Sequence, residues 1–170
     1  MKTTKRLTFL GLSLAIMIIL IAFERTLPPI MPPLGKIGLA NIVVMYLIIF
    51  MGKKDAILAV VLKAVFNFLM RGYLAAFLSL AGGLVSVFIM LILWSSFKDK
   101  NLMPIVAISI AGAIGHNVGQ LVVASLILQD LRVIVGYLPL VVIFGTIFGA
   151  VTGVFLKVVM PVFKRFMNLR

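Results

Sequence analysis

The chain has 170 residues, of which 64% are hydrophobic and only 12% are charged, and it has a net charge of +12 and no cysteine. Soluble domains have about 45–50% apolar and about 25% charged residues, so this composition excludes a soluble fold. Without cysteine, and with one histidine and four carboxylates, disulfides and thiolate metal sites are excluded and a histidine metal cage is disfavoured. We expect one membrane domain over residues 1–170, with no metal and no cofactor.

Six apolar runs predict an all-α integral membrane protein, a compact bundle of six transmembrane helices. A bilayer core of about 30 Å takes roughly 20 apolar residues per helix, which leaves little chain for other domains. The first run resembles a signal peptide but lacks a convincing small-residue cleavage site, so it is interpreted as the first span. The second and third runs look short. The expected spans lie near 7–26, 37–51, 55–71, 73–96, 102–128 and 136–163.

Two connections have distinctive compositions. The segment 26–36 contains four prolines, which cannot continue a helix, and we expect an extended loop that could act as a lid. The segment 52–55, Gly-Lys-Lys-Asp, predicts a tight turn that makes the second and third spans an antiparallel pair.

The basic residues lie in short clusters between the apolar runs, a pattern that favours membrane topology over nucleic-acid binding. If both termini are cytoplasmic, the inner segments hold eleven basic residues and the outer segments hold four, with Lys63 left inside a span. This excess follows the positive-inside rule. We therefore predict a multi-pass protein of the cell membrane with cytoplasmic termini.

Small residues recur at every fourth position of several spans. Gly145, Gly149 and Gly153 form one such ridge, which lets helix backbones approach closely. Gly11 and Ala15 form a shorter ridge on the first span. It could dock a partner helix or pack internally, and the residues alone favour internal packing.

Polar groups inside spans are costly, so each needs a reason. Lys63, Asn67 and Arg71 follow one another at spacings of four and lie along one stripe that rises toward the outer surface. A stripe of donors suits an anion or a carbonyl-rich ligand. Alternatively, Lys63 snorkels to water or pairs with a carboxylate such as Glu24, and Arg71 anchors the helix at the interface.

The fifth span holds His116, Asn117 and Gln120 in its outer half. Their polar groups must find partners across helices or on a ligand, and interhelical hydrogen bonds average only about 0.6 kcal/mol. We treat them as candidate ligand contacts, with structural hydrogen bonding as the alternative. Because Glu24, Arg25, Lys36 and Asn41 lie at the same outer level, we expect one polar cavity, open to the outside, with an excess of positive charge.

The order of these motifs resembles the substrate-binding S components of energy-coupling factor transporters. The resemblance rests on the proline loop and 34–42, on 62–72, and on Ser79-Leu80-Ala81-Gly82-Gly83-Leu84-Val85-Ser86, and the riboflavin-specific members show a similar layout. Within that superfamily the chain is most similar to the heptaprenyl diphosphate synthase component I group, also called the Gx transporter family, which the stretch 115–120 also fits.

The resemblance implies a six-helix fold and a ligand site in the outer half that the first loop closes. It also implies that the first helix docks, through small residues such as Gly11 and Ala15, onto a transmembrane coupling subunit driven by paired ATPases. Here glycine replaces the usual first alanine. The ligand contacts that it implies are Lys36, Asn41, Lys63, Asn67 and Ser79.

The sequence does not predict an enzyme, because no nucleophile with a base and no pair of carboxylates stands at catalytic spacing. The aspartate-rich motifs of prenyl diphosphate synthesis are also missing, since Asp55, Asp99 and Asp130 are isolated. The leading hypothesis is a subunit that captures a small vitamin-like or anionic solute from outside. The alternatives are a membrane accessory of isoprenoid or quinone metabolism, which predicts a lipid-open groove with a prenyl chain, and a partner in flavin-linked electron transfer.

Overall fold

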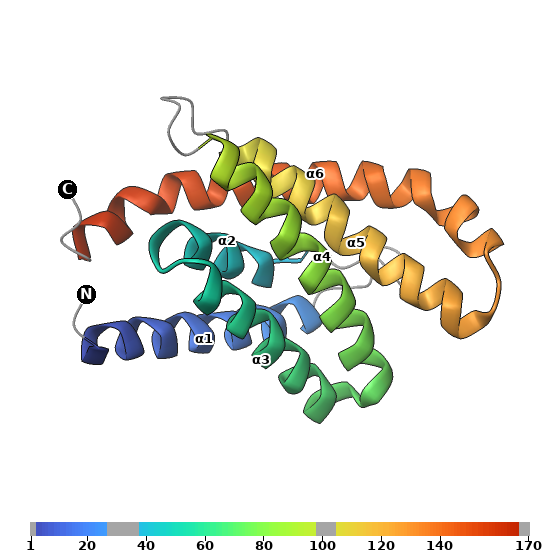
Figure 1. Cartoon of the computed structure of the whole chain (residues 1–170), viewed down its shortest axis with the longest axis horizontal. Helices are drawn as coiled ribbons and strands as arrows, with labels where there is room; N and C mark the ends of the chain where they lie inside the picture. Colours follow the sequence, from blue (N-terminus) through green and yellow to red (C-terminus); the bar gives the residue numbers. More distant parts are fainter. Residues whose placement is uncertain (1–2, 27–37, 98–104, 167–170) are drawn as a thin grey trace.

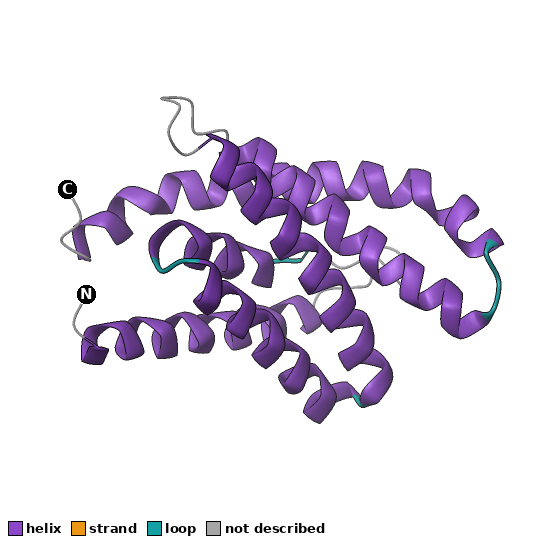
Figure 2. Ribbon diagram, in the orientation of Figure 1, coloured by secondary structure: helices purple, strands orange, loops and turns teal. Residues whose placement is uncertain are grey.

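The computed structural model describes residues 3–26, 38–97 and 105–166, and these residues form six α-helices without a strand. Figure 2 shows the short turns that join α2 to α3, α3 to α4 and α5 to α6. The all-α fold is therefore confirmed. The helices are α1 (Thr3–Thr26), α2 (Ala40–Phe50), α3 (Lys53–Arg71), α4 (Tyr73–Phe97), α5 (Ile105–Leu128) and α6 (Arg132–Phe166).

Four helices, α1, α4, α5 and α6, are long and apolar enough to cross a membrane, which indicates a membrane protein. The remaining two differ from a typical span for separate reasons. At about 1.5 Å per residue, the 11 residues of α2 reach about half of a 30 Å bilayer core. Helix α3 is longer, but it contains Lys53, Lys54, Asp55, Lys63 and Arg71.

Helix α2 is the centre of the core. It packs against each of the other five helices, and every residue from Val43 to Ile48 is buried. A helix that is apolar on all sides is typical of a protein core or of a membrane span, and here the burial of α2 shows that other helices cover it. The short second run thus forms an internal helix that other helices enclose, and its length is set by the core that it fills.

The long helices α4, α5 and α6 pack consecutively along their lengths (Figure 1). The predicted glycine ridge on α6 makes the α5 contact, since a Cβ on Gly149 would lie 2.6 Å from the Cα of Ile110 and one on Gly153 would lie 2.8 Å from the Cα of Val106. These glycines let the two backbones meet directly.

Helix α1 packs only against α2 and α3 among the described helices. It begins at the end of the molecule where α6 ends, and it runs toward the opposite end (Figure 1). Near the start of α1, Arg6 forms an ion pair with Asp55 in the first turn of α3, with Nη2 to Oδ1 at 2.8 Å and Nε to Oδ2 at 3.1 Å. No pattern in the sequence predicted this ion pair.

The turn that was predicted over 52–55 is shorter in the structure: the chain turns at Gly52, and Lys53, Lys54 and Asp55 already belong to α3. Gly52 has a φ of +102°, in the left-handed region that glycine adopts at little cost, and it separates α2 from α3. Asp55 lies in the first turn of α3, where a carboxylate is stabilised by the helix dipole. The turn therefore orients α3 and positions the partner of Arg6.

Candidate functional site

A polar cavity of about 40 Å³ lies between the last turns of α1, the second half of α3, and the facing parts of α4 and α5. It is found toward the end of the molecule where α1 ends and α2 begins. Its lining residues are Ile21, Glu24, Arg25, Gly38, Lys63, Asn67, Arg71, Ser79, His116 and Gln120.

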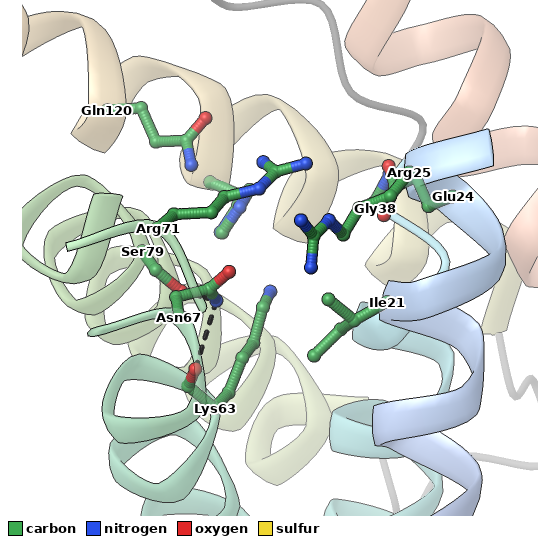
Figure 3. Close-up of a pocket in the computed structure, with 10 residues that line it drawn as sticks. Ile21, Glu24, Arg25, Gly38, Lys63, Asn67, Arg71, Ser79 and Gln120 are labelled. Carbon is green, nitrogen blue, oxygen red and sulfur yellow. Dashed lines mark hydrogen bonds between the residues drawn. The ribbon is translucent and has the colours of Figure 1, made fainter. Parts of the chain in front are cut away.

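Lys63 is the central residue of the cavity. Its side chain is only 5% exposed, and its Nζ donates a hydrogen bond of 3.1 Å to Oδ1 of Asn41 on α2. Figure 3 shows that the ammonium group points into the space that the guanidinium groups of Arg25 and Arg71 also face. A buried ammonium group is retained only where polar partners offset its desolvation.

Asn67 links α3 to α4 on one side of the cavity. One turn after Lys63, its Nδ2 donates to the Lys63 carbonyl at 2.9 Å and to Oγ of Ser79 at 3.0 Å (Figure 3). Both Asn67 and Ser79 are buried. These bonds hold α3 in register with α4 beside the cavity.

The α5 side of the cavity depends on Gly82 of α4. A Cβ at this position would lie 2.6 Å from the carbonyl oxygen of His116 and 2.7 Å from Cγ of Gln120. Glycine therefore permits α5 to approach α4 closely enough for His116 and Gln120, both buried, to line the cavity. The pair Gly82-Gly83 belongs to the stretch that carries the family resemblance, but its sequence did not indicate this close approach of α5.

The structure brings most of the predicted site residues together. Six of them line the cavity: Lys63, Asn67, Arg71, Ser79, His116 and Gln120. Asn41 reaches the site through its bond to Lys63. Asn117 is buried but does not line the cavity, because it projects from a neighbouring face of α5, and Lys36 lies outside the described residues.

Glu24 and Arg25 were not selected as site residues, yet both line the cavity. Oε1 of Glu24 accepts a hydrogen bond of 2.5 Å from the backbone N–H of Gly38, which ties the end of α1 to the start of α2. With Ile21 they occupy positions i, i+3 and i+4, which lie on one helix face. That spacing could have indicated that Glu24 and Arg25 face the cavity, but solvation at the membrane interface explained their charges equally well.

A second hollow, of a different character, lies between α1, α2 and α6. This apolar groove has a volume of about 400 Å³. The hydroxyl of Ser13 in its wall already donates to the Phe9 carbonyl at 2.7 Å. It shares no residue with the polar cavity, and it is lined by Phe9, Leu12, Ser13, Ile16, Leu20, Ile42, Val43, Tyr46, Phe155, Leu156 and Val159.

Gly11 and Ala15 are exposed on α1, and a Cβ on Gly11 would meet no atom within 4 Å. The internal packing that the sequence analysis favoured for this ridge does not occur within the described residues. The ridge therefore lies on the outer surface of α1.

The described lining of the cavity offers charge and hydrogen-bonding groups. No group of three or more metal-ligating side chains occurs within residues 3–26, 38–97 and 105–166. Among the residues that the structure describes, the polar groups around the cavity are cations and neutral hydrogen-bonding groups, with Glu24 as the single carboxylate. Such a set suits recognition of an anion.

Comparison with known proteins gives one match. No curated protein and no solved structure matches the chain. The model of the family described as heptaprenyl diphosphate synthase component I matches residues 12–159, which include all six helices in whole or in part. A component I has no enzymatic activity of its own, in agreement with the prediction that this protein is not an enzyme. The chain belongs to the heptaprenyl diphosphate synthase component I family.

Proposed function

We propose that this protein is the solute-binding membrane subunit of a transporter of the energy-coupling factor type. In this proposal the six helices form a bundle in the cell membrane with both termini in the cytoplasm, and the polar cavity faces outward. The observation that carries it is the buried ammonium group of Lys63, directed into a cavity that two arginines and neutral hydrogen-bonding groups also line. A charge inside a membrane helix marks a functional site by default.

The energy for transport comes from other subunits. The sequence has no Gly-x-x-x-x-Gly-Lys-Ser/Thr loop for nucleotide phosphates. The exposed ridge of Gly11 and Ala15 on α1 supports docking onto a coupling subunit, because small residues allow a partner helix to approach closely. Paired ATPases on that subunit then drive release of the solute into the cell.

Native mass spectrometry of the detergent-extracted protein tests the capture function. The wild type should retain one small solute per chain, and Lys63→Met and His116→Ala should lose it. Lys157→Met, which changes an exposed lysine of α6, is the matched control and should retain it. A wild type that retains no solute, or variants that bind as the wild type does, would contradict the proposed site.

The apolar groove favours a second candidate, a non-catalytic membrane accessory of isoprenoid or quinone metabolism. This role predicts a lipid-open groove, and the groove between α1, α2 and α6 has a wall suited to a hydrocarbon chain. A prenyl lipid retained by the wild type and expelled by Ile16→Trp, which fills the groove, would support this role. Ile18→Trp, on the exposed face of α1, is the control.

A further inference from the structure

The charge inside the polar cavity is unbalanced. Among the described residues, three cations (Arg25, Lys63 and Arg71) and one carboxylate (Glu24) line it, which leaves +2 when His116 is neutral. The chain has only three further carboxylates. Asp55 binds Arg6 in the first turn of α3, Asp130 accepts the backbone N–H of Arg132, and Asp99 lies outside the described residues.

The two arginines are positioned for an anion from solution. Both are exposed, and no carboxylate of the described residues forms an ion pair with either of them. Figure 3 shows the two side chains entering from opposite sides, with both guanidinium groups above the ammonium group of Lys63. Guanidinium forks bind carboxylate and phosphate oxygens through paired N–H donors. Two forks and an ammonium group around one small space suit an oxyanion.

The charge selects the kind of oxyanion. A carboxylate supplies one negative charge and would leave one positive charge uncompensated. A phosphate monoester carries about −1.5 to −2 at pH 7 and has three acceptor oxygens. Because three cations surround the space and a dianion offers them three acceptor oxygens, the dianion is the better match.

The size of the cavity limits how much of the ligand enters. A cavity needs a volume of about 10–15 Å³ to hold one water molecule. The cavity, at about 40 Å³, therefore accepts one compact oxyanion and excludes a ring system. The rest of the ligand must lie beyond Arg25 and Arg71. The apolar groove shares no lining residue with this cavity, so the two are separate hollows and the groove is not part of the oxyanion site.

From these observations we infer that the captured solute is a water-soluble phosphate monoester whose phosphate sits between Lys63, Arg25 and Arg71. This inference rests on the proposed capture function and names its substrate class.

Two probes that share a ring and differ in charge test the inference. Phenyl phosphate and benzoate are titrated against the full-length protein in detergent at pH 7.5 and fixed ionic strength, with binding followed by calorimetry. Phenyl phosphate should bind at least tenfold more tightly than benzoate. Arg25→Gln and Arg71→Gln should each weaken the binding of phenyl phosphate about tenfold and the binding of benzoate less than threefold. Arg132→Gln, at an exposed arginine at the start of α6, should change neither.

The results that would overturn the inference are distinct. Equal or tighter binding of benzoate, with both probes lost in Lys63→Met, would leave the capture function standing and assign a carboxylate ligand. Competition by phosphatidic acid added to the micelles would assign the site to a lipid headgroup. If neither probe binds, the phosphate assignment is wrong, and the co-purification experiment decides independently whether any solute is captured.

Discussion

The α5–α6 pair and helix α1 are held in the fold in different ways. Helices α5 and α6 meet backbone to backbone along the ridge of Gly145, Gly149 and Gly153. Helix α1 contacts only α2 and α3 among the described helices, and it is tied to them at its two ends by Arg6–Asp55 and Glu24–Gly38. The polar cavity is lined by residues of α1 on one side and of α5 on the other. The difference teaches that the α5–α6 pair is fixed by direct backbone contact, whereas α1 is held by the buried side chains of Leu10, Met17 and Ile21 together with these two polar contacts.

The largest effect is expected from filling the α5–α6 contact. Gly149→Leu places side-chain atoms where a Cβ would already lie 2.6 Å from the Ile110 backbone, and backbone cannot move aside as a side chain can. Overpacking of this kind costs about 1–3 kcal/mol or more. Thermal unfolding in detergent measures it. Gly136→Leu, at an exposed glycine of the same helix with no atom within 4 Å of its Cβ position, should have little effect.

A smaller loss is expected at the start of α1. Arg6→Gln leaves the carboxylate of Asp55, which is 5% exposed, without its guanidinium partner, so the unfolding temperature should fall. The double variant Arg6→Gln with Asp55→Asn should be no less stable than Arg6→Gln alone, because a pair acts as one unit. Additive losses in this cycle would show that the ion pair does not hold α1.

A still smaller loss of stability is expected at the wall of the polar cavity. Asn67→Ala removes the bonds to Ser79 and to the Lys63 carbonyl, and an intramolecular hydrogen bond contributes about 0.5–1.5 kcal/mol of net stability. The same variant should weaken solute binding, because α3 loses its register with α4. Phe68→Ala, at an exposed neighbour on α3, is the control for both measurements. Unchanged unfolding in Asn67→Ala would mean that the α3–α4 wall does not depend on this side chain.

The smallest effect on the isolated chain is expected at Gly11→Leu, since nothing lies within 4 Å of the Cβ position and the residue is exposed. Unfolding should be unchanged. Co-purification with the coupling subunit should be lost if this ridge docks α1, while Phe23→Ala, on another exposed face of the same helix, should keep it. A complex that survives Gly11→Leu would move the docking surface elsewhere.

Much of the fold was predictable because hydrophobicity is a property of local sequence. The six apolar runs, the glycine ridge on α6 and the turn at Gly52 were each legible along the chain. Six of the nine predicted ligand contacts also line the cavity, because helical spacing places Lys63, Asn67 and Arg71 on one face. Whether they contact a ligand stays a prediction.

The sequence by itself determined that the chain is an all-helical membrane protein with polar groups gathered at one level, because composition and periodicity depend only on neighbours along the chain. Only the tertiary structure decided that α2 is enclosed by other helices, that Arg6 pairs with Asp55, and that Glu24 and Arg25 complete the cavity. These contacts join residues 14 to 49 positions apart or different helices, and no local pattern specifies which distant groups meet.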